Sequence, residues 1–266
     1  MDIASWPVPF QSLSLPAIAL VHVAYLAGFA IRGSFGFGSN LPAVLVTAWV
    51  LGPHHAVLLA ALVAMLAQLQ LMPQGVNGAH WGRVVPVVIT MFFGTAVGVW
   101  LLTIIEADWL LLVLALLIGI MVVTDRLRLL ERVGRFIDVR SPRVAASVGT
   151  VSSMMSTLSG GGALYLLAPY LKLAAASPLE FRNTNVMIGG IAGLARVLML
   201  SAAGLVTFEL LLDAASLLPA ITLGTWIGTR YFRAVSAERF FATLQWMLLL
   251  AAALLAVKGV GLLLES

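Results

Sequence analysis

Two arginines and two glycines recur at helical spacing between residues 181 and 198. Arg182, Gly189, Gly193 and Arg196 follow one another at steps of seven, four and three residues, and Asn185 lies beside that helix face. An arginine at the centre of a bilayer costs about 2.5–3.5 kcal/mol, so it turns toward a partner or a wet cavity. Arg196 is therefore a candidate counter-charge for an anion. The alternative, which we favour for Arg182, is that the side chain reaches a membrane surface.

Small residues interrupt the apolar sequence at two places, one in each half of the chain. The two clusters are Gly38, Ser39 and Asn40, and Ser159, Gly160, Gly161 and Gly162. Broken backbone survives in lipid only where it is buried in protein or lines a cavity, and helix N-termini there offer N–H groups to anions. We expect both clusters to contribute to one substrate-binding site. Close helix packing through small residues is the alternative.

Three further polar residues are candidates for the same function. Gln68 lies four residues after Ala64 in a stripe of alanines, so it faces either the site or a neighbouring helix to which it hydrogen-bonds. Asp213 and His54 are candidates for a coupling proton site. For Asp213 the alternative is an ordinary position at a helix end, and for His54 a position at the membrane interface.

The composition indicates a membrane protein. Hydrophobic residues make up 61% of the chain, charged residues 10%, and the mean hydropathy is +1.06. The net charge of +4 fits basic loops between spans, so we expect no nucleic-acid partner. No cysteine occurs, which excludes disulfides and thiolate metal sites. We expect no cofactor, no metal site and no enzymatic activity. The absence of a P-loop motif predicts that any transport is not driven by ATP.

The apolar blocks form two sets of five. We divide the chain into a first membrane repeat (1–125), a basic cytoplasmic linker (126–142) and a second membrane repeat (143–266), which together make one integrated membrane domain. A shift of 125 residues aligns Pro53 with Pro178. We expect an all-α polytopic membrane protein with two inverted-topology repeats, each a glycine-broken helical hairpin plus about three transmembrane helices. The alternative is eight spanning helices, with the first of each half broken.

The basic residues favour the hairpin arrangement. It places all of the fifteen Lys and Arg residues on one side except Arg32, Arg196 and Lys258, whereas the eight-helix arrangement distributes them over both sides. Basic loops face the cytoplasm. We therefore expect a multi-pass protein of the bacterial inner membrane with its basic loops in the cytoplasm. The scarcity of acidic residues within the spans argues against a cation as the substrate.

Two stretches resemble the signature regions of a known family. They read GFGSNLPAVLVTAWVLGPHHAVLLAALVAMLAQLQLM at 36–72 and SGGGALYLLAPYLKLAAASPLEFRNTNVMIGGIAGLAR at 159–196. They resemble the TauE/SafE family of membrane transporters, and the likeness covers nearly the whole chain. Where this family often has a fuller glycine cluster in its first repeat, this chain has Gly38, Ser39 and Asn40.

The resemblance implies a transporter of small sulfur-containing anions. We expect a secondary transporter, and more specifically an exporter, of sulfite, an organosulfonate or another sulfur oxyanion bound at mid-membrane. A carrier of small carboxylates or of another solute, and a membrane assembly protein without transport activity, are the alternatives. H⁺ or Na⁺ as the coupling ion and a homodimeric state stay open. The lipid bilayer is the other expected partner.

Overall fold

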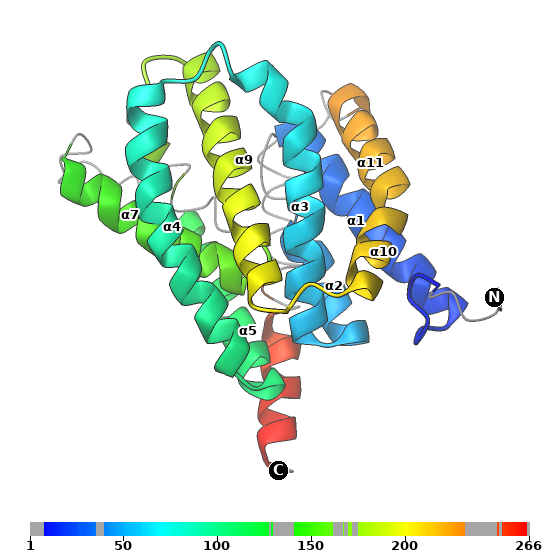
Figure 1. Ribbon diagram of the computed structural model, residues 1–266. Helices are drawn as coiled ribbons and strands as arrows, with labels where there is room; N and C mark the ends of the chain where they lie inside the picture. The colour runs from blue at the N-terminus through cyan, green and yellow to red at the C-terminus, as the bar shows by residue number, and fades with distance from the viewer. Residues whose placement is uncertain are drawn as a thin grey trace.

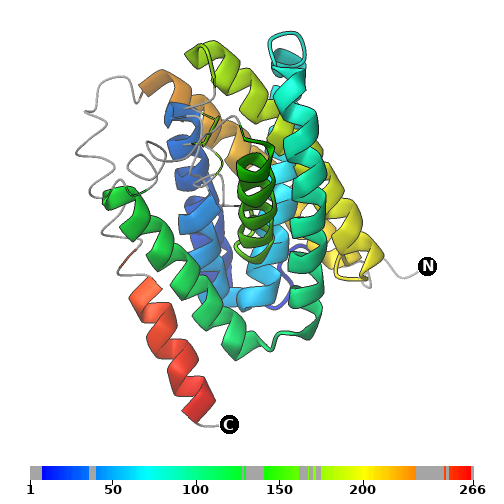
Figure 2. The ribbon, with the colours of Figure 1, turned by 90° about the vertical axis from the view of Figure 1, so that its left-hand side faces the viewer.

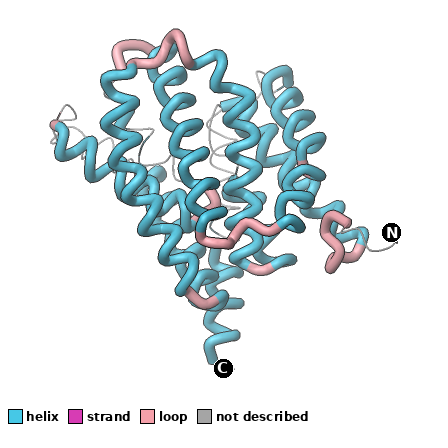
Figure 3. The backbone as a smooth tube through the Cα atoms, in the orientation of Figure 1, coloured by secondary structure: helices cyan, strands magenta, loops and turns pink. Residues whose placement is uncertain are grey.

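The computed structural model describes residues 8–35, 40–127, 129, 141–161, 167, 170–171, 175–231, 249 and 252–264. Over these residues the regular elements are all α-helices, as expected (Figures 1 and 3). They are α1 (Leu15–Phe35), α2 (Asn40–Leu51), α3 (Pro53–Gly75), α4 (Trp81–Ile104), α5 (Ala107–Arg126), α7 (Pro142–Leu158), α9 (Pro178–Ala202), α10 (Phe208–Ser216) and α11 (Leu218–Tyr231). A C-terminal helix covers 252–264.

Six stretches within the described residues are long and apolar enough to cross a membrane. They are Leu15–Arg32, Pro53–Pro73, Trp81–Ile104, Ala107–Thr124, Leu179–Ala202 and Phe208–Gly228. A spanning helix needs about 20 mostly apolar residues. Large apolar side chains such as Ile89, Phe93 and Trp100 of α4 are exposed on the outside of the bundle, as lipid-facing residues are. The chain is therefore an all-helical, multi-pass membrane protein.

Prolines mark the start of three helices. Pro53, Pro142 and Pro178 each occupy the first turn of a helix, where the missing N–H is not needed. Ser177 caps α9, because its side-chain oxygen accepts a hydrogen bond from the N–H of Glu180 at 3.1 Å. The sequence alignment of Pro53 with Pro178 thus pairs the starts of α3 and α9.

Helices α3 and α9 pack against each other in opposite directions. Gly75 at the end of α3 lies against Asn183 near the start of α9, while Gly193 farther along α9 faces Met65. Glycine allows this approach, since a Cβ atom at Gly75 would lie 3.2 Å from the carbonyl oxygen of Asn183. Two related helices packed antiparallel are what an inverted repeat predicts.

Two parallel helix pairs flank this centre. Gly149 of α7 lies against Thr90 of α4, and Gly98 farther down α4 lies against Thr157. On the other flank, Gly224 of α11 lies against the backbone of α1 at Leu26. Each pair joins a helix from one half of the sequence to a helix from the other half, so the halves interlock (Figures 1 and 2). The repeat relationship itself stays a prediction.

The described contacts favour hairpins over broken spans at the start of each half. Phe10, which precedes α1, and His55, at the start of α3, both contact Asp213. Helices α1 and α3 therefore begin at the same end of the bundle. In the second half, Arg83 at the start of α4 pairs with Glu180 at the start of α9, and α7 begins at that same end. The arms are unequal in the first half, since α1 has 21 residues and α2 has 12.

Most of the described charged residues at the helix ends separate by end of the bundle. The exceptions are Glu180, which pairs with Arg83, Asp125 at the end of α5, and Lys258, which donates to the carbonyl oxygen of Trp49 near the end of α2. Arg83, Arg143, Arg182 and Arg230 lie at the starts of α4, α7 and α9 and the end of α11. The acidic residues Glu106, Asp108 and Glu209 lie at the opposite end, before α5 or in the first turns of α5 and α10. Most of the linker 126–142 is outside the described residues. The separation is the one expected from the hairpin arrangement.

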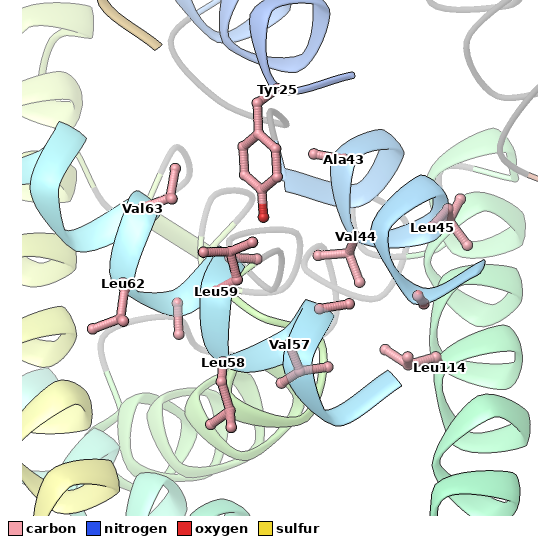
Figure 4. Packing of buried hydrophobic residues seen from close by; sticks show 14 of the residues in the cluster. Tyr25, Ala43, Val44, Leu45, Val57, Leu58, Leu59, Leu62, Val63 and Leu114 are labelled. Atoms are coloured by element: carbon pink, nitrogen blue, oxygen red, sulfur yellow. The ribbon is translucent and has the colours of Figure 1, made fainter. Parts of the chain in front are cut away.

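A buried apolar cluster fixes α1 and α2 against α3. Tyr25 of α1 points toward α2 and α3, where Val44, Leu59 and Val63 surround it, and Leu114 of α5 closes the far side (Figure 4). Burying each of these large side chains contributes roughly 1.5–3 kcal/mol in water, and in lipid the same contacts act through close packing. This packing sets the position of two polar residues that lie farther along the same helices, Arg32 and Gln68.

Candidate functional site

A cavity of about 50 Å³ lies between α1, α3, α4, α7 and α9. Its walls are small or apolar residues for the most part, including Ala64, Gly189 and Gly193. Five polar side chains also reach it: Arg32, Gln68, Ser152, Ser156 and Arg196. A concave apolar site with a few polar groups is the usual form of a small-molecule binding site.

Arg196 is a buried charge on α9. Its side chain is 6% exposed, and Nη2 donates a hydrogen bond to Oγ of Ser156 on α7 at 2.6 Å. The Nε atom is buried and has no hydrogen-bond partner among the described residues. A buried charge needs compensation, and an unpaired N–H beside a cavity is available to a ligand. Arg196 therefore occupies the position expected of an anion counter-charge, and the snorkelling alternative does not describe it.

Arg32, in the last turn of α1, brings a second positive charge to the cavity. Its Nη2 atom donates a hydrogen bond to Oε1 of Gln68 on α3. The Nε2 atom of Gln68 in turn donates to the carbonyl oxygen of Val186 on α9, at 2.9 Å. Gln68 thus orients the guanidinium of Arg32 and ties α3 to α9. Gly189 makes room for it, since a Cβ atom there would lie 3.0 Å from Nε2 of Gln68.

Two serines of α7 complete the polar wall. Ser152 and Ser156 are four residues apart, so they lie on one face of the helix. Ser156 accepts from Arg196 and keeps its own hydroxyl hydrogen free to donate. The hydroxyl of Ser152 is fully buried and has no hydrogen-bond partner in the described part of the chain. Both serines can therefore donate to an oxygen atom in the cavity.

The cavity is electropositive. Two guanidinium groups line it, and no carboxylate is among the lining residues that the structure describes. Within the described part of the chain, the acidic residues Glu180 and Asp213 are paired elsewhere, with Arg83 and His55. No group of three His, Cys, Asp or Glu side chains that could hold a metal ion occurs among the described residues. The described lining residues thus offer donors and positive charge, a combination that suits an anion.

The helical backbone is interrupted where α7 ends, beside the cavity. Gly160 and Gly161 have φ angles of +68° and +100°, a region that disfavours side chains, and Gly161 lines the cavity. A Cβ atom at Gly160 would lie 2.8 Å from Cβ of Ala60 on α3. The N–H of Gly161 donates to the carbonyl oxygen of Ser156 at 2.6 Å, and the hydroxyl of Ser159 donates to that of Met155 at 2.8 Å. These donors close the end of α7.

The structure brings three of the predicted site residues to the cavity, namely Gln68, Gly161 and Arg196. Asn185, Ser159 and Gly160 are near it but are not among its lining residues. Asn40 begins α2, whereas Gly38, Ser39 and Gly162 lie outside the described residues. The contribution of helix N-termini at the two glycine clusters thus stays a prediction.

Sequence reasoning did not select Arg32, Ser152 and Ser156 as site residues. A signal for Arg32 exists, because it is the one charged residue within the α1 sequence. The serines give a weaker signal, since Ser and Thr recur along α7 without any feature that distinguishes the two that reach the cavity.

The predicted coupling residues lie at the acidic end of the bundle. Asp213 of α10 is buried and accepts a hydrogen bond from the N–H of Phe10 at 2.6 Å. Its other oxygen lies 2.9 Å from Nε2 of His55. The histidine that pairs with Asp213 is thus His55, and not its neighbour His54, the candidate from the sequence. Adjacent residues of a helix point about 100° apart, so only one of the two can face α10.

Comparison with known protein families adds a match over most of the chain. The family described as sulfite exporter TauE/SafE matches residues 20–258. No curated protein and no solved structure gave a significant match. The matched region includes every described residue that lines the cavity. With its six apolar helices and nearly complete match, the chain belongs to the sulfite exporter TauE/SafE family of membrane transporters.

Proposed function

We propose that this protein is a secondary transporter that exports a small sulfur oxyanion, sulfite or an organosulfonate, through the cavity between α1, α3, α7 and α9. The observation that carries the proposal is the convergence of Arg32 and Arg196 on one cavity without a carboxylate among its lining residues. A cation in that cavity would meet two positive charges. An oxyanion would neutralise them and accept hydrogen bonds from the free donors.

The surrounding helices support movement of the ion. The cavity walls come from both halves of the chain, with Arg32 and Gln68 from the first and Ser156 and Arg196 from the second. Alternating access in related architectures arises when one half rocks against the other around such a site. Any such motion would change the distance between the two guanidinium groups, and so the affinity for the anion.

We further propose that the coupling ion is a proton that binds at the pair formed by His55 and Asp213. This pair joins α3, which carries Gln68, to α10. A proton bound between the carboxylate and the imidazole would change the charge of this contact. The end of the bundle with the arginines at the starts of α4, α7 and α9 is proposed to face the cytoplasm of a bacterial inner membrane.

The test of the proposed function is binding and flux with the purified protein. Wild type, Arg196→Ala and Arg143→Ala are compared in a thermal-shift assay with sulfite, sulfate, sulfoacetate, taurine and acetate, and then in liposomes loaded with sulfite. Arg143 is exposed at the start of α7 and is the matched control.

A sulfur oxyanion should raise the melting temperature of wild type and Arg143→Ala only. Stabilisation by acetate alone would favour a carboxylate carrier. Lack of any anion effect would overturn the proposal.

A further inference from the structure

The geometry points to a small, doubly charged oxyanion as the species that the cavity binds, in preference to a monoanion of the same size or to a larger organosulfonate. This inference rests on the proposed function and narrows its substrate class. It follows from the charge of the cavity, the kind of polar atoms left free there, and the volume.

The first observation is the charge balance. Arg32 and Arg196 bring two positive charges, and neither makes an ion pair with a carboxylate in the described part of the chain. Residues 36–39 and 162–166, which follow α1 and the break after α7 in the sequence, contain no Asp or Glu. A monoanion would leave one guanidinium uncompensated in an apolar interior, whereas a dianion balances both.

The second observation concerns the free polar atoms. Both polar atoms of the Gln68 side chain have a hydrogen-bond partner, because Oε1 accepts from Arg32 and Nε2 donates to the carbonyl oxygen of Val186. The buried groups without a partner at the cavity are the Nε of Arg196 and the hydroxyl of Ser152. The first can only donate, and the second is free to donate. Such groups suit oxygen atoms that carry no hydrogen, as in a fully ionised oxyanion.

The third observation is size. An apolar cavity of about 150 Å³ holds benzene, which has six non-hydrogen atoms, so a cavity of about 50 Å³ suits a smaller, compact ion. Sulfite has four non-hydrogen atoms and sulfate five, whereas taurine has seven and sulfoacetate eight. Taurine and sulfoacetate carry a two-carbon chain with a further polar group. The cavity, which has Met65 and Met91 in its wall, therefore suits the smaller ions.

The experiment compares ions that differ in charge and not in shape. Sulfate and perchlorate are both tetrahedral, but sulfate carries two charges and perchlorate one. Their dissociation constants are measured by calorimetry on the purified full-length protein at constant ionic strength. We expect sulfate to bind at least about tenfold more tightly, which corresponds to about 1.4 kcal/mol. Sulfite should bind more tightly above its second pKa, where it is a dianion, than below it.

The outcomes separate the two levels of the proposal. If perchlorate binds as tightly as sulfate, and sulfite affinity is the same on both sides of its second pKa, the preference for a dianion is wrong and the anion transporter stands. If none of these ions binds, the proposed function fails as well. Neither comparison requires a variant to fold.

A charge variant adds an independent readout. Arg32→Gln removes one positive charge, so it should weaken sulfate binding strongly and reduce the ratio of the sulfate and perchlorate affinities toward one. Arg32→Lys keeps the charge and should restore part of that ratio. The matched control is Arg143→Gln, which makes the same chemical change at an exposed position. An unchanged ratio in Arg32→Gln would overturn the charge-balance explanation.

Discussion

The hydroxyl oxygen of Ser156 on α7 lies 2.6 Å from Nη2 of Arg196 on α9, and both side chains are buried. This contact orients the guanidinium so that its Nε atom stays unpaired next to the cavity. Helix α7 also packs along α4 through Gly94, Gly98 and Gly149. The position of the arginine thus depends on a helix that ends at the glycine break only a few residues later.

The first prediction concerns this hydrogen bond. Ser156→Ala removes the acceptor and leaves a buried N–H of Arg196 without a partner. Hydrogen bonds to charged groups contribute about 1.5–3 kcal/mol, so the free energy of unfolding should fall by about that amount. Anion binding should weaken less than in Arg196→Ala, because the charge is still present. Chemical unfolding in detergent and calorimetry measure the two effects.

The control for this prediction is Ser201→Ala. Ser201 is exposed on α9 and donates to the carbonyl oxygen of Val197 at 2.8 Å, so its loss should change stability little. Equal effects of the two substitutions on stability and binding would show that the contact between Ser156 and Arg196 has no particular role.

The second prediction concerns the break after α7. Gly160 has a φ of +68°, and a Cβ atom there would lie 2.8 Å from Cβ of Ala60 and 3.0 Å from the carbonyl oxygen of Val57. Gly160→Ala should lower stability by about 1–3 kcal/mol through backbone strain and the clash with α3. Ala60→Gly in the same chain should restore part of this loss, since it removes the shortest of the close contacts.

The matched control is Gly119→Ala in α5, where a Cβ atom would meet nothing within 4 Å. That substitution should be neutral or slightly stabilising, as alanine is in helices generally. Melting temperatures of the wild type and the three variants in one detergent measure the differences. If Gly160→Ala and Gly119→Ala have the same melting temperature, the interruption after α7 does not depend on Gly160.

Part of this site could be predicted from the sequence because it follows helical periodicity. Gly189, Gly193 and Arg196 were placed on one face by their spacing, and they line one cavity. The break at 159–161 followed from glycine composition, and α7 ends there. These features depend only on the local sequence and on the free-energy cost of a charge in a membrane.

Other parts depend on which helices become neighbours. Arg32 was recognisable as an embedded charge, but its approach to the cavity results from the packing of α1 against α2 and α3. His55, and not His54, contacts Asp213 because of the way α3 packs against α10. The two residues of this pair are 158 positions apart in the sequence. Periodicity within one segment carries no information on such partners.

The third prediction concerns the contact between His55 and Asp213. Asp213→Asn keeps an oxygen that can accept from the N–H of Phe10 but removes the negative charge beside His55. Sulfite binding should be retained, because this pair is not among the residues that line the cavity. The acceleration of sulfite flux by a pH gradient should be lost, as measured in liposomes with and without the gradient.

Glu209→Gln is the control for this third prediction. Glu209 is an exposed acidic residue in the first turn of the same helix, so its substitution should leave the gradient effect intact. If wild-type flux does not respond to a pH gradient, or if Asp213→Asn responds as wild type does, the proton site is not at Asp213.

The last prediction concerns the orientation of the chain in the membrane. The natural sequence has no cysteine, so single cysteines can be introduced without background labelling. Ala175 precedes α9 and Ala203 follows it, so these positions lie at opposite ends of one spanning helix. A membrane-impermeant maleimide added to intact cells should label Ala203→Cys, and should label Ala175→Cys only after the membrane is opened. Ser236→Cys, outside the described residues, should behave as Ala175→Cys does under the hairpin arrangement. Labelling of Ser236→Cys in intact cells would contradict the hairpin arrangement. The reverse pattern at Ala175 and Ala203 would show that the basic end of the bundle faces outward, whereas basic loops are expected in the cytoplasm.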